Sequence, residues 1–249
     1  MNPTPPVSSG EALPVPSLVH PELPIVGRTE KFPVRRIYCV GRNYLAHIRE
    51  MKEADERDPP FFFQKPSDAL VSDGKVPYPS STEDFQFECE LVIAIGVAAS
   101  NLGTEEALGC VYGYAVGLDM TRRDRQRESF KRGLPWEIGK SFDHSSPCGA
   151  IHPVAVCGHK LTGQLELSVN GEVRQRSQLE KMIWNVPEII SQLSRQYRLM
   201  PGDLVYTGTP DGVGAVVPGD RLVGTVAGLE PLVVDITPAL VPNASPSHD

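Results

Sequence analysis

The sequence lacks several features that mark membrane and secreted proteins. Its longest apolar stretch, residues 91–99, is far too short to cross a bilayer. Residues 1–13 hold neither the basic nor the apolar region of a secretory signal. The five cysteines are an odd number without a CxxC pair, which is typical of free thiols. We therefore expect a cytoplasmic protein in a reducing compartment, with no membrane contact.

An excess of positive charge is also missing. The chain has 24 Lys and Arg against 31 Asp and Glu, a formal net charge of −7. This balance argues against non-specific binding to nucleic acid or to anionic lipid. The 22 glycines and 24 prolines among 249 residues favour turns over long helices, which excludes a helical bundle.

Three regions are expected along the chain. Residues 1–30 are predicted to be a Pro-rich N-terminal arm, residues 31–237 a single domain, and residues 238–249 a C-terminal tail. Short apolar, β-branched segments within the domain predict strands. These segments are residues 36–40, 61–65, 88–96, 111–120, 165–175, 203–207, 222–226 and 232–236.

Helical patterns are few and short. They cover residues 44–52, 121–132 and 186–197, and Pro187 suits the first turn of the last one. The pair Asn170-Gly171 predicts a hairpin turn inside residues 165–175. Because strands do not alternate with helices as in parallel βαβ units, we predict an α+β, β-rich domain with few short helices.

Two carboxylates flank Cys89 at the start of an apolar strand. Glu88 and Glu90 share one face of the strand, because alternate residues point the same way. Asp119 ends the next apolar run and is a candidate third oxygen ligand. Such a set suits a hard divalent cation, Mg²⁺ or Mn²⁺, better than zinc. The same pattern also fits two solvent-exposed glutamates at the start of a strand and an Asp119 that caps a helix.

A possible general base lies after the segment Gly41-Arg42-Asn43. His47 and Glu50 are three residues apart, so on a helix Glu50 accepts from one imidazole nitrogen and leaves the other as a base. An ordinary exposed His/Glu pair on a short helix is the alternative.

Basic residues gather after Asp119. Residues 121–131 are basic with acidic residues among them, a pattern typical of a solvent-exposed helix face. If Asp119 binds a metal ion, Arg123 and Gln126 on the next turn are placed to reach an anionic substrate. Lys140 lies among apolar residues, where a lone ammonium is costly unless paired. Both a functional role for Lys140 and a side chain that extends its ammonium to solvent are consistent with this position.

A glycine-rich loop and a cysteine/histidine segment complete the candidates. The amides of residues 206–214 are suited to cradle a carboxylate, although a plain β-turn also fits, and the loop lacks the ending of a phosphate loop. The spacing of Cys148, His152, Cys157 and His159 matches no usual zinc pattern, so we expect no zinc there.

Taken in order, several segments resemble the fumarylacetoacetate hydrolase family. The matching pieces are CVGRNYLAHIREM (39–51), FFFQKPSDALV (61–71), ECELVIAIG (88–96), YGYAVGLDMTRRDRQ (112–126), GLPWEIGKSFD (133–143), VNGEVRQ (169–175) and GDLVYTGTPDGVG (202–214). The resemblance covers residues 34–237. Within the family, the chain is most similar to the short members that hydrolyse fumarylpyruvate in gentisate breakdown, and next to acylpyruvate hydrolases.

The resemblance implies a mixed β-roll, a homodimer and one Mg²⁺ or Mn²⁺ per subunit. It assigns the metal ligands to Glu88, Glu90 and Asp119, and the base with its orienting acid to His47 and Glu50. It also implies that Lys140 and Gln126 are catalytic and that Arg123 and Thr209 bind substrate. Relatives often carry His where this chain has Phe87, which bears on the hydrogen bonds around the ligands.

The implied reaction is metal-dependent hydrolysis of a carbon–carbon bond in a 2,4-diketo acid, with fumarylpyruvate giving fumarate and pyruvate. Hydrolysis of another acylpyruvate and decarboxylation of oxaloacetate are the alternatives at the same site, and a non-catalytic binding protein is a weaker one. The distal carboxylate of fumarylpyruvate needs a cation, for which Arg42 and Arg122 are the candidates.

Overall fold

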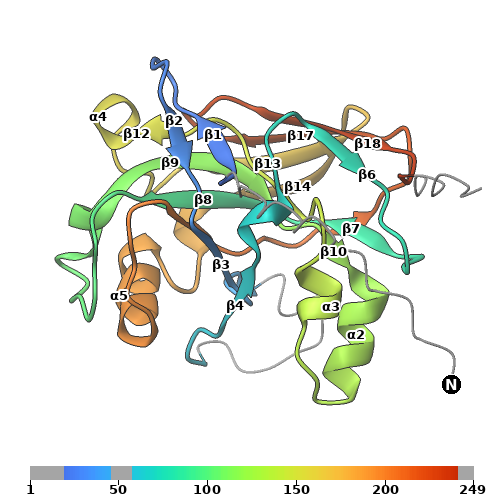
Figure 1. The fold of residues 1–249 in the computed structure, drawn as a ribbon, viewed down its shortest axis with the longest axis horizontal. Coiled ribbons are helices and arrows are strands. Elements are labelled where there is room, and N and C mark those ends of the chain that lie inside the picture. The colour runs from blue at the N-terminus through green and yellow to red at the C-terminus, as the bar shows by residue number, and fades with distance from the viewer. Residues whose placement is uncertain (1–19, 46–57, 241–249) are drawn as a thin grey trace, which may run out of the picture.

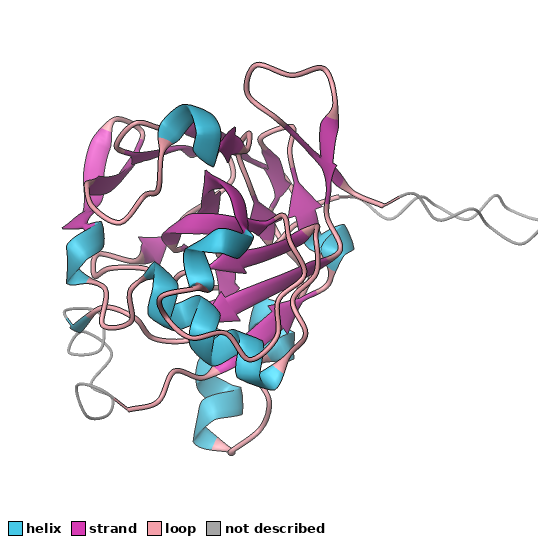
Figure 2. Cartoon of the chain, turned by 90° about the vertical axis from the view of Figure 1, so that its left-hand side faces the viewer, coloured by secondary structure: helices cyan, strands magenta, loops and turns pink. Residues whose placement is uncertain are grey.

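The computed structural model describes residues 20–45 and 58–240. Two sheets make up most of this part (Figure 1), and strands outnumber the short helices (Figure 2). The strand-rich α+β fold predicted from the sequence is confirmed. None of the described helices is long and apolar enough to cross a membrane.

The larger sheet has six strands and carries the functional residues described below. In order across the sheet these are β12 (His152–Pro153), β9 (Val111–Leu118), β8 (Cys89–Ile95), β15 (Asp203–Tyr206), β3 (Arg36–Val40) and β4 (Phe62–Lys65). Neighbouring strands are antiparallel except for β15 and β3, which are parallel. Strand β4 therefore lies at one edge of the sheet.

The second sheet has five strands and covers one face of the β8–β9 pair (Figure 1). Its order is β14 (Glu172–Gln178), β13 (Gln164–Val169), β17 (Arg221–Val226), β18 (Leu232–Thr237) and β6 (Lys75–Pro77). The predicted hairpin is present: β13 pairs with β14, and both Asn170 and Gly171 have positive φ, as a tight hairpin turn requires.

Three small sheets complete the strands. They are β1 (Glu22–Pro24) with β2 (Lys31–Pro33), β11 (Ser146–Pro147) with β5 (Leu70–Val71), and β10 (Thr121–Arg122) with β7 (Phe85–Phe87) and β16 (Gly214–Ala215). Strand β1 falls within the segment predicted as an arm, and its Leu23 is fully buried.

The described helices are short. They are α2 (Arg123–Lys131), α3 (Glu137–Lys140), α4 (Val154–Cys157) and α5 (Val186–Gln196), with 3₁₀ turns η1 (Ser67–Ala69), η2 (Ala107–Cys110) and η3 (Leu179–Lys181). Helix α5 begins as its sequence predicts, since Asn185 and Glu188 form a reciprocal capping box. Helix α2 begins two residues later than predicted, because Thr121 and Arg122 pair with β7 instead.

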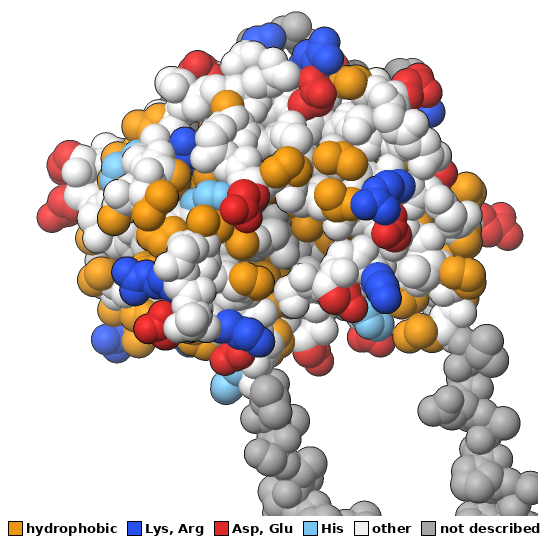
Figure 3. Space-filling model, turned by 90° about the horizontal axis from the view of Figure 1, so that it is seen from above, with side chains coloured by type: hydrophobic (Ala, Val, Ile, Leu, Met, Phe, Trp, Pro, Cys, Tyr) orange, Lys and Arg blue, Asp and Glu red, His pale blue; other side chains and the backbone are white. Residues whose placement is uncertain are grey.

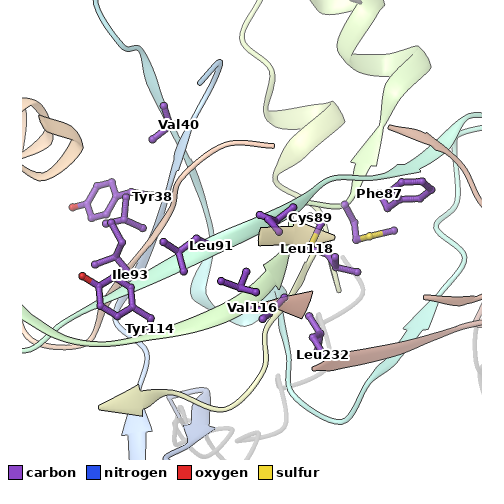
Figure 4. Packing of buried hydrophobic residues seen from close by; sticks show 14 of the residues in the cluster. Tyr38, Val40, Phe87, Cys89, Leu91, Ile93, Tyr114, Val116, Leu118 and Leu232 are labelled. Carbon is purple, nitrogen blue, oxygen red and sulfur yellow. The ribbon is translucent and has the colours of Figure 1, made fainter. Parts of the chain in front are cut away.

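Alternate side chains of β8 point to opposite faces of the sheet and belong to two different apolar clusters. Cys89, Leu91 and Ile93 point into the larger cluster between the two sheets, where they meet Val116 and Leu118 of β9 (Figure 4). The residues between them face the other side, where the smaller cluster includes Val92 and Ala94. Glu90 shares this second face, because it alternates with Cys89 and Leu91.

The face over β17 and β18 mixes charges of both signs. Lys, Arg, Asp and Glu side chains are interspersed there with apolar ones (Figure 3). This face presents no extended area of positive charge of the kind that attracts a polyanion.

Candidate metal centre and its surroundings

Three buried carboxylates meet at the end of the β8–β9 pair. Glu88 precedes β8, Glu90 lies inside it and Asp119 follows β9, and the main-chain N–H of Asp119 donates to the Glu88 carbonyl at 2.8 Å. Each is at most 5% exposed, and carboxylate oxygens from all three lie within 4.8 Å of one another. The structure thus brings together the three residues singled out as metal ligands.

Two cations selected from the sequence lie against these carboxylates. The Nη2 atom of Arg123 is 2.5 Å from Glu88 Oε1. Lys140 Nζ donates to Glu88 Oε2 and Asp119 Oδ2, each at 2.8 Å, and to Thr121 Oγ1 at 2.7 Å. Burial alone would lower the pKa of Lys140, but Asp119 and Glu88 outweigh that effect and raise it, so the ammonium stays charged.

A third buried cation was not selected from the sequence. Lys65, the last residue of β4, places Nζ 2.8 Å from Asp119 Oδ1. Its ammonium donates to the main-chain carbonyls of Met120, Lys140 and Ser145. Asp119 Oδ1 is consequently buried beside a positive charge without accepting a hydrogen bond from the described residues.

These donors fit a hard divalent cation. The cluster offers only carboxylate oxygens, which Mg²⁺ and Mn²⁺ prefer, and one of them is a buried oxygen with no hydrogen-bond donor. Burial, followed by the charges of Asp119 and Glu88, raises the pKa of Glu90 well above its ordinary value. A bound cation would reverse this effect by favouring the ionised form.

Arg123 and Gln126 lie together on α2, at the edge of the carboxylate cluster. Arg123 also donates to Gln86 Oε1 at 2.8 Å and to Gln126 Oε1 at 2.5 Å. Three of the five guanidinium N–H groups are thus used within the protein, and the Gln126 amide keeps its NH₂ group as a donor.

Helix α3 reaches the cluster because Gly139 has no side chain. A Cβ at this position would lie 2.7 Å from the main-chain nitrogen of Gln126. Helices α2 and α3 lie side by side (Figure 1), and this close approach places Lys140 beside the carboxylates.

The predicted carboxylate-cradling loop closes another side of the centre. Gly208, with φ +92, donates its N–H to Glu90 Oε2 at 2.6 Å. Thr209 Oγ1 donates to the Cys89 carbonyl at 2.9 Å and accepts from Gln175 Nε2 at 2.8 Å. Gln175 Oε1 in turn accepts the Cys89 N–H at 3.0 Å. One buried side chain therefore ties Thr209 to the strand that carries the acids.

His47 and Glu50 lie outside the described residues. The segment that leads to them is anchored by Asn43, which is fully buried. Its amide donates to the carbonyls of Trp184 and Thr207, and its Oδ1 accepts the Trp184 N–H.

The cysteines and histidines discussed next lie outside the carboxylate cluster. Burial raises the pKa of the Cys39 and Cys89 thiols and so disfavours the nucleophilic thiolate form. His152 Nε2 accepts the Glu230 N–H, and His159 Nδ1 lies 3.0 Å from the Tyr114 hydroxyl.

Sequence reasoning missed Lys65, Gln175 and Asn43. The signal used for Lys140, an ammonium among apolar residues, also applies to Lys65, which follows three phenylalanines and a glutamine. Gln175 and Asn43 carry no such signal, because their partners are distant in sequence.

Gln175→Leu is expected to lower the free energy of unfolding by about 1–3 kcal/mol, since it leaves the buried Cys89 N–H unsatisfied. Urea denaturation of the metal-free protein measures this change. Gln178→Leu, at the half-buried end of the same strand, is the control and should stay within about 0.5 kcal/mol. Equal stability of the two variants would contradict the bridging role.

Comparison with known proteins agrees with this geometry. Residues 36–237 match the family model described as fumarylacetoacetate (FAA) hydrolase C-terminal. Fumarylpyruvate hydrolase of Ralstonia sp is 45% identical over 180 residues, 72% of this chain and 93% of that protein. The human mitochondrial oxaloacetate tautomerase FAHD1 is 41% identical over 198 residues, 78% of this chain and 88% of that protein. The crystal structure of fumarylpyruvate hydrolase from Pseudomonas aeruginosa in complex with Mn²⁺ and pyruvate superposes with a TM-score of 0.88 at 49% identity, covering 92% of this chain and 100% of that one. The chain belongs to the fumarylacetoacetate hydrolase family.

Proposed function

We propose that this protein hydrolyses a carbon–carbon bond of a 2,4-diketo acid, and that fumarylpyruvate, cleaved to fumarate and pyruvate in gentisate breakdown, is its substrate. The observation that carries the proposal is the buried cluster of Glu88, Glu90 and Asp119 beside Lys140. The similarity to two fumarylpyruvate hydrolases, one solved with Mn²⁺ and pyruvate, supports it.

Glu88, Glu90 and Asp119 would hold one Mg²⁺ or Mn²⁺. The bound ion supplies Lewis acidity and stabilises negative charge on a 2-oxo acid. Arg123 has two N–H groups that make no hydrogen bond within the described residues and are available to the substrate carboxylate, and Thr209, bound to the Cys89 carbonyl, is the second substrate-binding residue.

The remaining steps fall to side chains of this chain. His47, oriented by Glu50, takes a proton from the water that attacks the C4 carbonyl. The Gln126 NH₂ group donates to the C4 oxygen as it becomes negative, and the Lys140 ammonium, whose three N–H groups bind Glu88, Asp119 and Thr121, stabilises that charge electrostatically. The C3–C4 bond then breaks, C3 takes up a proton to give pyruvate, and the acyl half leaves as fumarate.

Of the two candidate arginines, the structure favours Arg42 for the distal carboxylate. Its guanidinium carbon lies 5.5 Å from the Phe61 ring centroid and 5.9 Å from that of Trp136. Both rings line a cavity of about 400 Å³ together with Phe63, whose ring centroid is 5.4 Å from Lys140 Nζ. Arg122 instead lies over Phe142, at 4.2 Å.

Two further properties belong to the proposal. The family resemblance supports a homodimer, and the free thiols support a cytoplasmic location.

The reaction is tested by following the ultraviolet absorbance of fumarylpyruvate with purified protein and Mg²⁺ or Mn²⁺. We expect rapid loss of the diketo acid, with equal amounts of fumarate and pyruvate formed, because the centre stabilises the charge that develops at C4 and C3. EDTA should abolish the reaction and excess Mn²⁺ should restore it. Turnover that is indifferent to EDTA would overturn the metal-dependent mechanism.

Acetylpyruvate and oxaloacetate are measured in parallel. The similarity to oxaloacetate tautomerases makes action on oxaloacetate, by decarboxylation or tautomerisation, the second candidate. Turnover of oxaloacetate without cleavage of fumarylpyruvate would replace the proposed substrate while keeping the metal centre.

His47→Ala is expected to lower kcat by about 10²–10⁴-fold, because the attacking water loses its base. Mn²⁺ affinity should stay unchanged, since His47 is not among the proposed ligands; steady-state kinetics and calorimetric titration measure the two effects. His20→Ala, an exposed histidine, serves as the control. Near-normal kcat in His47→Ala would remove this residue from the mechanism.

Arg42→Met is expected to raise KM for fumarylpyruvate about 10-fold or more, the loss expected when a charge-assisted pair worth about 1.5–3 kcal/mol is removed. KM for acetylpyruvate, which has no distal carboxylate, should change less than twofold. Arg122→Met is the matched variant. If only Arg122→Met shows the substrate-selective effect, the distal carboxylate site is at Arg122 instead.

A further inference from the structure

We propose that Lys65 is a positioning residue of the metal centre, holding Asp119 by charge alone so that Asp119 Oδ1 keeps its lone pairs for the cation. The inference rests on the proposed metal site and adds a residue to which neither the sequence nor the comparisons give a role.

The ammonium of Lys65 has no spare hydrogen. A lysine ammonium carries three N–H donors and no acceptor. All three reach main-chain carbonyls, those of Met120 and Ser145 at 3.0 Å and that of Lys140 at the end of α3. The side chain is 0% exposed, so water does not compete for these donors.

Asp119 therefore interacts with the charge of Lys65 but does not accept a hydrogen bond from it. Lys65 Nζ is 2.8 Å from Asp119 Oδ1, yet this oxygen accepts no hydrogen bond from any residue that the structure describes. The other oxygen, Oδ2, accepts from Lys140. Two lysines thus fix the plane of the carboxylate, and only one of its oxygens is engaged by a donor.

Lys65 also links three separate segments whose relative positions define the metal centre. Through the three carbonyls, one ammonium links edge strand β4 to the residue after Asp119, to the last residue of α3 and to the turn before β11. The same α3 residue, Lys140, presents its side chain to Glu88 and Asp119. Pro66 follows Lys65 directly and ends the strand there.

Electrostatics and positioning predict opposite effects of removing Lys65. A positive charge beside a ligand repels a divalent cation, so its loss by itself would tighten metal binding. The loss of an outer residue that orients a ligand typically weakens metal affinity by about 10–100-fold. The sign of the change in affinity therefore decides between a bystander charge and a positioning residue.

The test is calorimetric titration of the metal-free protein with Mn²⁺, without substrate. Lys65→Gln keeps amide donors for the carbonyls but removes the charge, and we expect its Kd for Mn²⁺ to rise by about 10–100-fold. Circular dichroism first verifies that the variant is folded. Ser146→Ala is the matched control, because this buried serine neighbours the network and its hydroxyl contacts no hydrogen-bond partner among the described residues.

A Kd for Lys65→Gln that is unchanged or lower than that of the wild type overturns the proposal. If Lys65→Gln does not fold, Lys65→Arg takes its place. Arginine keeps the charge but not the geometry of the ammonium, so Mn²⁺ affinity should again fall about 10-fold or more. Wild-type affinity in Lys65→Arg overturns the proposal as well. Absence of Mn²⁺ binding in the wild-type protein would instead defeat the metal site itself, and the role of Lys65 with it.

Discussion

Burial of three carboxylates at one point is the constraint on which the rest of the centre depends. Removing charged groups from water costs several kcal/mol each unless opposite charges and hydrogen bonds compensate. Glu88, Glu90 and Asp119 are compensated by Arg123 from α2, Lys140 from α3 and Lys65 from β4, together with the Gly208 N–H. Helices α2 and α3 and strand β4 thus lie where their basic side chains can pair with the buried carboxylates.

Local sequence patterns predict the parts of this arrangement that depend on neighbours along the chain. The alternation around Cys89 predicts that Glu88 and Glu90 share a face, and the structure shows Cys89 in the opposite core. The hairpin at Asn170 was predicted from its turn residues and the helix from Val186 from its helical pattern and Pro187, and both are present. The helix predicted over residues 121–132 is present but begins at Arg123, because Thr121 and Arg122 pair with β7 and this tertiary contact outweighs local propensity.

The remaining parts of the centre depend on contacts between segments far apart in the sequence. Lys65 lies 55 residues or more from the carbonyls it binds, and Gln175 lies 86 residues from Cys89. No periodicity connects such pairs, and the tertiary packing of sheets, helices and loops brings them together. The buried lysine after an aromatic run was the one readable signal, because an ammonium in such a place requires partners.

The three buried cations also bear on how the protein folds. A classical zinc finger stays unfolded until its metal ion binds. Here Arg123, Lys140 and Lys65 already neutralise the acids when the chain closes. A divalent ion bound at this centre would therefore not be required for folding, and a chelator should leave a folded protein that can bind the ion again.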